Sequence, residues 1–535
     1  MLGATLPDNL SLLGKPRRRL VKLNSSRLSN SQTEMFEGAN RSVQAGCKRL
    51  RAAFVVLLLA SVSVVNLICG DLPAVAASSL PADSMKTLPM EKEESVSVYV
   101  PSEAAPDGGL AVNVIYPKTP RHKDGAPVAV IVPDGLGPSG LRFTMHAAQG
   151  GFAEVRFAFP GGGLKQFHSG GSWDERGPNS QLALKDVLLF AHGEKLDSKG
   201  KKITEVVPTK IDLNNVGAVG WGNGGNALLI SMSKFALDLG FLKWVAFYES
   251  ALGPLMSPSV LGTTNELVLN KHYRQGSAAT GKPLVDWKKM KWQSEIFRNR
   301  TEHLGLGREP SRGVLFFDEN DNGIWEESQE FPIAHYTAPG GDKKYYAPEI
   351  IEAMIKQKLF PKGRWPKRIA FLSESEQFFQ DRDGSQFIKQ IPLQYPDLLV
   401  TIFGSRLDHE QRQPDHPHIA MSYNMWLASK PKWLRLNPDP KYVGFIADMN
   451  PMNFIDNKPD ESIDASSMEA HLEPEGFVPD YVYMQATIAE LADRVKKDNL
   501  KQIDVVINPY MNDTVKQYKK EQLLKQAAQQ QNAQK

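Results

Sequence analysis

The chain has 535 residues, and its 41% hydrophobic and 23% charged content is that of a soluble globular protein rather than a disordered or fibrous one. Lys and Arg total 63 against 60 Asp and Glu, which gives a formal net charge of +3. Residues 1–76 hold 10 of the basic and 4 of the acidic residues, so the rest carries 53 basic and 56 acidic residues, a net charge of −3. The basic excess belongs to the N-terminal segment, which excludes an electrostatic basis for binding nucleic acid.

The N-terminal segment is expected to direct export. Residues 52–70 form an uncharged, apolar run after a basic stretch, and the small-residue sequence Ala-Val-Ala ends at Ala76. This pattern predicts a signal peptide, residues 1–76, whose cleavage releases a periplasmic or extracellular protein. The alternative is an uncleaved membrane anchor, because the 19 residues of 52–70 are just long enough to cross a bilayer. Both cysteines, Cys47 and Cys69, lie in this segment, so the rest of the chain has neither disulfides nor a catalytic thiol.

Beyond a Pro-, Ser-, Lys- and Glu-rich linker at 77–93, short apolar runs alternate with helical patterns. The first two runs alternate in polarity as an antiparallel hairpin does, and later runs are continuously apolar, as buried strands are. Helices are predicted at about 180–192 and from Asn226 onward. Strands are predicted at 95–100, 110–116, 127–135, 153–163, 216–221, 242–250, 367–372 and 397–404. Strands that alternate with helices predict an α/β protein with a mostly parallel central sheet and helices on both faces.

This α/β domain is predicted over 94–436, with an insertion inside it and an extension after it. The insertion, residues 252–366, is cap-like, and its Lys-, Trp- and Arg-rich first part shows no clear periodicity. Residues 437–510 form a C-terminal extension with one helical pattern at 486–498. The Gln- and Lys-rich tail, 511–535, is predicted to be a frayed helix or disordered. A cap would determine the choice of ligand, and this one carries no recognisable motif.

The sequence Gly-Trp-Gly-Asn-Gly-Gly-Asn at 220–226 runs from a predicted strand into a predicted helix. With serine in place of Gly222 it would contain the G-x-S-x-G turn, or elbow, that exposes a reactive hydroxyl above a sheet. Together with Asp408-His409, Asp174-Glu175-Arg176-Gly177 and His416-Pro417-His418-Ile419, this stretch resembles exported bacterial members of the α/β-hydrolase superfamily, which includes serine esterases and peptidases. The resemblance covers about 94–436 and implies an α/β-hydrolase fold.

The resemblance also implies a nucleophile at the elbow, an acid after a later strand and a histidine last in the chain. Gly222 stands at the nucleophile position. Glu374 or Glu376 follows the second-last predicted strand, and His409 follows the last one. A carboxylate in that place would orient the imidazole for proton transfer. The alternative is that both glutamates are solvated loop carboxylates, since charged side chains are mostly exposed.

Backbone N–H groups would form the oxyanion hole that accompanies such a triad. Asn223, directly after the nucleophile position, would supply one N–H, and Gly135 or Leu136 in the loop after the third strand would supply the second. Further along the chain, His416 and His418 have the spacing of paired metal ligands. The proline between them favours a rigid turn or a helix start instead.

Gly222 has no group that can attack a carbonyl carbon, and no other G-x-S-x-G sequence occurs in the chain. One hypothesis is therefore a non-catalytic protein that binds a small molecule, a peptide, an ester-like ligand or a partner through the former cleft. A second is an active esterase- or peptidase-like hydrolase whose nucleophile lies elsewhere or whose chemistry uses activated water. A third is a structural surface protein stabilised by calcium.

The calcium hypothesis rests on residues 318–330, Asp-Glu-Asn-Asp-Asn-Gly-Ile-Trp-Glu-Glu-Ser-Gln-Glu. Alternating side-chain oxygens followed by glycine match the start of a calcium-binding loop. Gln329 stands at the twelfth position, where a bidentate glutamate is usual, and Glu330 comes one residue later. The predicted ligands are Asp318, Asn320, Asn322, Ile324 and Glu330. The stretch before the loop has a strand pattern, so it is similar to helix-less loops of exported bacterial proteins, and the alternative is an acidic surface turn.

Overall fold

The computed structural model describes the chain from residue 93 to residue 533, with gaps. The described ranges are 93–133, 138–250, 273–274, 284–294, 313–326, 329–333, 335–337, 343–360, 364–404, 417–436, 480–500 and 510–533. The predicted signal peptide or anchor lies outside them, as do most of 252–310 and all of 437–479. Within the described ranges, no helix combines the length and the apolar character that a membrane span requires.

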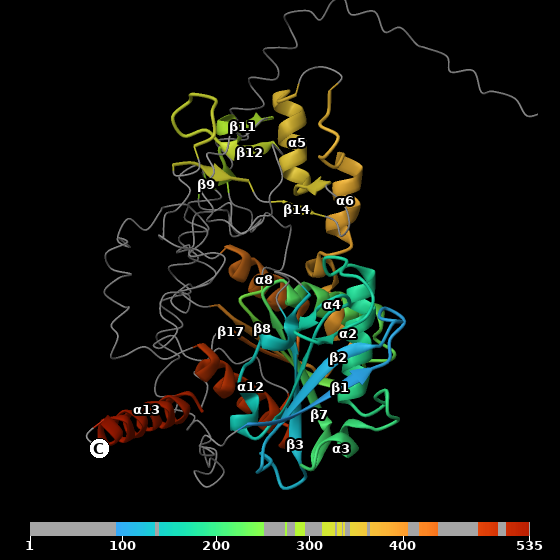
Figure 1. Cartoon of the computed structure of the whole chain (residues 1–535), viewed down its shortest axis with the longest axis vertical. Coiled ribbons are helices and arrows are strands. Elements are labelled where there is room, and N and C mark those ends of the chain that lie inside the picture. The colour runs from blue at the N-terminus through green and yellow to red at the C-terminus, as the bar shows by residue number, and fades with distance from the viewer. Residues whose placement is uncertain are drawn as a thin grey trace, which may run out of the picture. The chain divides into compact units, whose positions relative to one another are not determined.

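An eight-stranded central sheet has the order β1-β2-β4-β3-β7-β8-β16-β17 (Figure 1). Its first three strands in this order pair antiparallel, and every pair from β4 onward is parallel. The strands are β1 Glu94–Val100, β2 Leu110–Tyr116, β3 Ala126–Val132, β4 Ala153–Phe157, β7 Ile211–Trp221, β8 Leu242–Tyr248, β16 Leu399–Phe403 and β17 Trp433–Leu436. This mostly parallel sheet, entered through an antiparallel hairpin and flanked by helices, is an α/β-hydrolase fold and confirms the predicted fold class.

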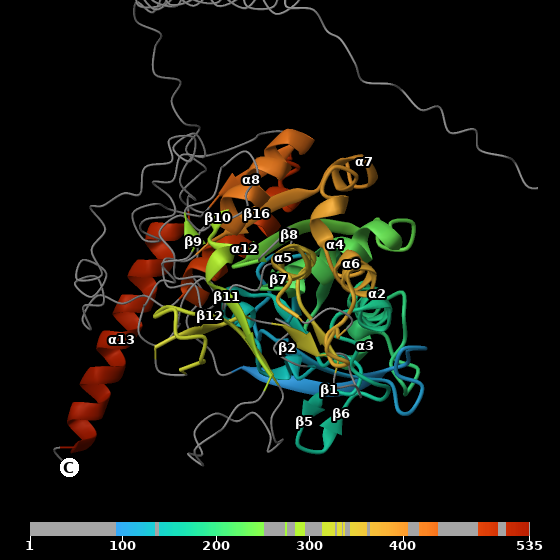
Figure 2. The same ribbon diagram turned by 90° about the horizontal axis from the view of Figure 1, so that it is seen from above.

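Helices cover both faces of the sheet, because its strands alternate side chains between two hydrophobic clusters. On one face lie α2 Pro178–Ala191, α4 Gly224–Lys234 and α8 Pro417–Ser429. On the other lies α12 Asp480–Lys496, and Figure 2 shows it across the sheet from α2 and α4. All seven residues of β3 are buried, which explains their continuously apolar sequence. Burial at about 25 cal/mol per Å² of apolar surface makes these two layers the main source of stability.

The insertion has a hydrophobic core of its own. A three-stranded antiparallel sheet, β11-β12-β13, packs with two helices around this cluster. Its elements are β11 Met290–Gln293, β12 Val314–Phe317, β13 Phe331–Pro332, β14 Tyr336–Thr337, β15 Lys344–Tyr345, α5 Pro348–Gln357 and α6 Leu372–Gln380. The cluster includes Phe378 and Phe379, so the core continues past the predicted end of the insertion at residue 366.

The remaining elements are short or peripheral. They are β5 Gly163–Leu164, β6 Phe167–His168, α3 Ile203–Val206, β9 Tyr273–Arg274, β10 Leu284–Val285, α7 Ile391–Gln394 and α13 Met511–Ala533, with 3-10 turns η2 Gly140–Arg142, η3 Ala147–Gly150, η5 Trp287–Lys289 and η6 Gly384–Phe387. The predicted tail is thus the helix α13, which packs beside α12 through Val515 and Tyr518.

Two predictions about the sheet were wrong. Residues 367–372 form no sheet strand: Ile369 makes one isolated bridge to Lys344, and α6 begins at Leu372. The Glu374 carboxylate accepts a hydrogen bond from the Phe371 N–H at 2.8 Å, which closes the first turn of that helix and ends the extended run. The prediction also lacked β17, whose four residues are too short to give a periodic signal.

Candidate functional site

The elbow is a two-residue turn, Gly222 and Asn223, between β7 and α4. Gly222 has a φ of 49°, a left-handed conformation that glycine adopts readily and other residues disfavour. Its N–H donates to the carbonyl oxygen of Tyr248 at 2.8 Å, and the Gly225 N–H donates back to the Gly222 carbonyl oxygen at 3.2 Å. The predicted strand, sharp turn and helix are therefore all present, and the residue at the turn has no side chain.

Three other glycines of this segment are required by close packing. A Cβ on Gly220 would lie 2.6 Å from the Gly225 Cα, and a Cβ on Gly224 would lie 2.5 Å from the Pro133 carbonyl oxygen. A Cβ on Gly225 would lie 2.4 Å from the Ser250 hydroxyl oxygen. Contacts this short do not occur for real Cβ atoms, so helix α4 can start this close to β3 and β8 only because these positions are glycine.

Asn223 is buried and precedes the first turn of α4. An N–H at this place faces the C-terminal edge of the sheet, where folds of this kind bind ligands. The predicted second donors, Gly135 and Leu136, lie outside the described residues, so the oxyanion hole stays a prediction. The side-chain oxygen (Oδ1) of the nearby Asn226 accepts a hydrogen bond from the Gly384 N–H at 2.9 Å. This bond connects α4 to η6.

Two buried polar residues that the sequence analysis missed follow β8 beside the elbow. Glu249 is 5% exposed, has a φ of 47°, and its N–H donates to the Phe403 carbonyl oxygen at 2.8 Å. The Ser250 hydroxyl donates to the Gly220 carbonyl oxygen at 2.9 Å, so its proton is committed to bracing the elbow. Their position directly after a buried parallel strand was the signal that could have identified them.

A row of aromatic rings packs beneath these residues, from η2 across the sheet to α12. Ring centroids are 5.0 Å apart for Phe143 and Trp221, and 4.9 Å apart for Trp221 and Tyr248. The row continues at 5.2 Å from Tyr248 to Phe403 and at 6.4 Å from Phe403 to Tyr483. Such edge-to-face and stacked contacts stabilise packing beyond burial alone, so the C-terminal ends of β7, β8 and β16 are held rigidly.

The structure places Glu374 and Glu376 on α6, in the insertion, and removes the sheet strand that they were expected to follow. Glu374 caps the helix and accepts a hydrogen bond from the Lys343 ammonium group at 2.7 Å. The hydrogen bond from Lys343 holds the pKa of Glu374 below its usual value. Glu376 is exposed. Glu374 is thus a helix-capping residue paired with a lysine, and only Glu376 is an exposed carboxylate, on a helix rather than in a loop.

His409 lies outside the described residues, but its place in the chain differs from the expected one. It follows β16, and β17 comes after it. By chain order, Asp408 follows the second-last strand of the described sheet, and His471 is the histidine that follows its last strand. His416 is likewise outside the described residues, and α8 begins at Pro417, in agreement with a helix start at this proline.

The predicted calcium loop is a tight turn after β12. The Asp318 carboxylate is buried and accepts the N–H groups of Asn322 and Gly323, each within 3.1 Å. Gly323 has a φ of 73°, the conformation that the sharp turn of such loops requires. The Glu330 carboxylate closes the loop by accepting the N–H groups of Glu319 at 3.0 Å and Glu326 at 2.8 Å.

Charge is concentrated in this loop. Burial, with Asp318 and Glu326 nearby, raises the pKa of Glu330. Neither this loop nor any other part of the described chain groups three His, Cys, Asp or Glu side chains in a metal-binding arrangement. The predicted ligand set combines the carboxylates of Asp318 and Glu330 with two asparagines and one backbone carbonyl, and these three are weaker ligands for a hard cation than carboxylates.

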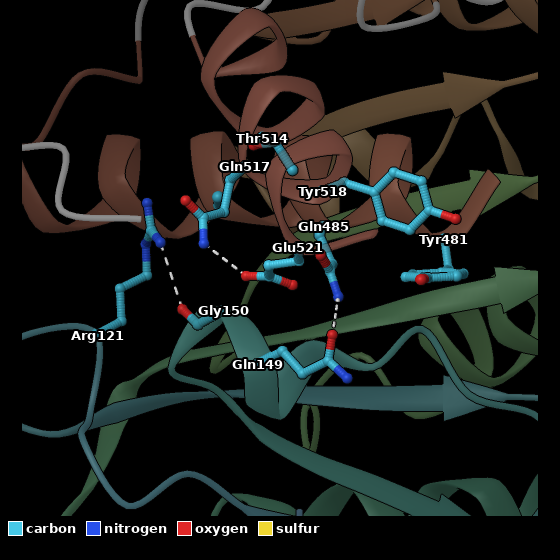
Figure 3. A pocket seen from close by; sticks show the side chains of 10 residues that line it. Arg121, Gln149, Gly150, Tyr481, Gln485, Thr514, Gln517, Tyr518 and Glu521 are labelled. Carbon is cyan, nitrogen blue, oxygen red and sulfur yellow. Dashed lines mark hydrogen bonds between the residues drawn. The ribbon is translucent and has the colours of Figure 1, made fainter. Parts of the chain in front are cut away.

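A cavity of about 70 Å³ lies away from the elbow, between η3, α12 and α13 (Figure 3). Arg121 at its rim donates to the Gly150 carbonyl oxygen at 3.3 Å and to the Asp493 carboxylate at 2.7 and 3.1 Å. His122 and Tyr510 contact the same carboxylate at 2.8 and 2.6 Å. A space of this size holds only a few water molecules, so this region joins the C-terminal helices to the sheet.

No protein-family model matches the sequence, and no curated protein matches it. Among solved structures, a carboxyl esterase 2 from Tuber melanosporum is 12% identical over 80% of this chain and 95% of that one, with a TM-score of 0.31. A hypothetical protein from Pseudomonas aeruginosa is 14% identical over 71% and 98%, with a TM-score of 0.29. For esterase Est22 the identity is 18% and the TM-score 0.23, and the match spans 31% of this chain and about half, 48%, of that one. The fold assignment rests on the sheet order and the elbow described above.

Proposed function

We propose that this chain is an exported α/β-hydrolase-like protein in which Gly222 stands at the nucleophile position, and that it binds a ligand or a partner without serine-type catalysis. The observation that supports this is an elbow with intact backbone geometry and no side chain at the turn. A nucleophile is normally held there in a strained conformation, which glycine relieves. The turn thus lacks a side chain that could act as a nucleophile, whereas the close packing of α4 against β3 and β8 around the turn is present.

The ligand in this proposal is a small molecule, a peptide or an ester-like compound bound at the C-terminal edge of the sheet. Backbone N–H groups at the start of α4 favour a carbonyl or anionic oxygen there. Nucleic acid is not among the proposed ligands, because the chain without its first 76 residues carries a net charge of −3. Export rests on the N-terminal sequence, and N-terminal sequencing of the protein secreted by a bacterial host is expected to start at residue 77. Recovery of the protein in the membrane fraction with residues 52–70 still attached would support the anchor.

The alternative is an active hydrolase with a displaced nucleophile or an activated water molecule. By the order acid then histidine, it would use Asp408, which follows β16 in the chain, as the acid and His471, which follows β17, as the histidine. A test compares hydrolysis of p-nitrophenyl acetate by the wild type, His471→Ala and His409→Ala. We expect equal and low rates for all three. Wild-type turnover that disappears only in His471→Ala would establish the alternative, and loss only in His409→Ala would restore the original assignment.

We further propose that calcium binds the loop 318–330. Support comes from the loop conformation, in which the Asn322 side-chain oxygen accepts the Ile324 N–H at 2.7 Å and Asp318 anchors the turn. Glu330, rather than Gln329, closes the loop and would supply the acid. Isothermal titration with calcium chloride should show one site per chain in the wild type and none in Asp318→Ala. Absence of calcium binding in the wild type would leave an acidic surface turn.

A further inference from the structure

The segment that connects α5 to α6 concentrates positive charge on the surface of the insertion. Residues 355–372 contain six basic residues and no Asp or Glu. Outside this segment, the chain beyond residue 76 has 47 basic and 56 acidic residues, a net charge of −9. Five of the six basic residues lie in the described part of the chain, and all five are exposed: Lys356, Lys358, Arg364, Lys367 and Arg368. The positive charge is therefore local to this segment and opposite in sign to the rest.

Acidic residues border the segment on both sides. Glu352 lies on α5, four residues before Lys356, and Glu374 lies in the first turn of α6. Glu374 is already paired with the Lys343 ammonium group at 2.7 Å. Figure 1 shows α5 and α6 next to each other in the insertion. The acidic side chains thus belong to the two helices, whereas the segment between them is purely basic.

A row of aromatic rings crosses the same surface and consists of Trp292, Phe360, Trp365 and Phe371. Ring centroids are 5.6 Å apart for the first pair and 4.9 Å for the second. Trp365 and Phe371 are 6.1 Å apart and stacked, with an interplanar angle of 22°. The first three rings are partly buried and pack against the core of the insertion. The row therefore leads outward from that core to Phe371.

Two large apolar side chains of this surface do not join the core. Phe371, at the N-cap of α6, is 57% exposed, and Ile355, near the end of α5, is 51% exposed. By contrast, α5 buries Ile351 and Met354 in the insertion core. A single exposed apolar residue is common on protein surfaces. Here both occur within one segment of exposed cations, next to a row of rings.

We propose that this basic aromatic patch, formed by the five exposed cations with Ile355, Trp365 and Phe371, binds the surface of an anionic phospholipid bilayer. Lysine and arginine side chains close to negatively charged headgroups are attracted to them. Aromatic rings are favoured at the boundary between headgroups and acyl chains. The long cationic side chains reach headgroups while the neighbouring apolar side chains enter that boundary.

The charge of the rest of the chain sets the orientation. A net charge of −9 outside the patch is repelled by an anionic surface, so the protein would approach such a surface with the insertion first. The patch is separate from the elbow, and the inference holds whether or not the elbow is catalytic. It also holds for either fate of the N-terminal segment, since a cleaved chain would attach reversibly and an anchored chain would be oriented.

Nucleic acid is the other polyanion that exposed cations and rings could bind. Single-stranded nucleic acid uses aromatic side chains as platforms on which bases stack. In this patch Trp365 and Phe371 stack on each other, so each already has a ring partner on one face. Base stacking also gives no reason for an exposed isoleucine, whereas a bilayer accounts for Ile355 and the rings together.

A dye at position 371 reports the local contact in the full-length chain, whose apolar run 52–70 would itself hold the protein on vesicles. In a Cys47→Ser and Cys69→Ser background, Phe371→Cys is labelled with the polarity-sensitive dye nitrobenzoxadiazole. Leu237→Cys, at a fully exposed leucine of the sheet domain, is labelled as the matched control. Vesicles of phosphatidylcholine are then added, with or without phosphatidylglycerol.

We expect a blue shift and stronger emission at position 371 with vesicles that contain phosphatidylglycerol, and no change at position 237. Raising the salt concentration should weaken the response, because it screens the attraction between charges. No response at position 371, an equal response at position 237, or an equal response to pure phosphatidylcholine would each overturn the proposal. An equal response to double-stranded DNA would assign the patch to polyanions in general and would also overturn it.

The positive charge is tested by Arg364→Gln with Lys367→Gln in the protein labelled at position 371. Lys199→Gln with Lys201→Gln, two exposed lysines of the sheet domain, is the matched control. Each cation near an anionic surface strengthens binding about fivefold, so we expect the equilibrium constant of the dye response to fall about 25-fold in the patch variant. The control should respond as the parent protein does. An equal effect of both double substitutions would overturn the proposal.

The apolar contribution is tested by Phe371→Ser, with Leu393→Ser at another exposed leucine as the control and the dye moved to Ile355→Cys. Serine is favoured at a helix N-cap, so Phe371→Ser should keep α6 folded, and its Tm without vesicles should equal that of Leu393→Ser. We expect a weaker dye response to phosphatidylglycerol vesicles in Phe371→Ser only. Equal responses of the two variants would contradict entry of Phe371 into the bilayer and overturn the proposal.

Discussion

The substitution Gly224→Ala tests how tightly the elbow is built. A Cβ at this position would lie 2.5 Å from the carbonyl oxygens of both Val132 and Pro133. These oxygens belong to the backbone at the end of a central strand, so neither can rotate away as a side chain would. Either α4 or the end of β3 must move, and overpacking of this kind costs about 1–3 kcal/mol.

The control is Gly240→Ala, whose Cβ would have the Ala236 carbonyl oxygen at 3.7 Å as its nearest neighbour. Both substitutions reduce the entropy of the unfolded chain equally, an effect of about 0.4–1 kcal/mol. The difference in free energy of unfolding between the two variants therefore measures the effect of the Cβ contact with the carbonyl oxygens of Val132 and Pro133 alone. Urea unfolding followed by tryptophan fluorescence should give a free energy of unfolding about 1–3 kcal/mol lower for Gly224→Ala than for Gly240→Ala. Equal values would refute the close approach of α4 to β3.

Three further predictions concern the remaining charged groups. Asp493→Asn should lower the free energy of unfolding at pH 7 by about 3 kcal/mol, because it leaves Arg121 without its buried ionic partner. Urea unfolding measures this loss, and a loss below about 1 kcal/mol would contradict the proposed role of the Asp493 network. Burial opposes ionisation of Asp493, but hydrogen bonds from His122, Arg121 and Tyr510 outweigh it and hold its pKa well below the usual range. The stability that this carboxylate contributes is therefore complete above its unfolded pKa of about 4 and is lost as the pH falls from there toward its lower folded pKa. The difference in free energy of unfolding between the wild type and Asp493→Asn should therefore shrink steadily below about pH 4; a constant difference would contradict this. Removal of calcium with EDTA should lower the Tm of the wild type and leave that of Asp318→Ala unchanged, with a difference of about 2.7 kcal/mol when calcium is at 100 times its Kd; identical responses would exclude the loop as the site.

The sheet and the elbow could be predicted from the sequence because their signals are local. Buried parallel strands such as β3 are continuously apolar, and the turn at Gly222 is marked by glycines that close packing requires. The triad partners could not be predicted, because their assignment depends on counting strands correctly. Residues 367–372 have a strand composition but start a capped helix, whereas β17 has only four residues. One false strand and one missing strand changed which residues follow the second-last and the last described strand of the sheet.

Arg176 shows a different limit of sequence analysis. Opposite charges two residues apart in the chain, such as Asp174 and Arg176, commonly form a local ion pair. In the structure Asp174 caps α2, and Arg382, 208 residues away from it, donates hydrogen bonds to the backbone carbonyl oxygens of Asp174 and Glu175. Which arginine makes these backbone hydrogen bonds is decided by the tertiary contact that brings the end of α6 against the start of α2. No spacing within the motif carries that information.

The central claim, that the elbow has lost its serine nucleophile, is tested most directly by labelling the full-length protein with a fluorophosphonate probe for serine hydrolases, with Gly222→Ser beside the wild type. Labelling of Gly222→Ser alone would show that the histidine and the oxyanion hole still function around the vacant turn. We expect no labelling of the wild type. Labelling of the wild type, mapped to a serine elsewhere in the chain, would contradict it and establish an active enzyme with a displaced nucleophile.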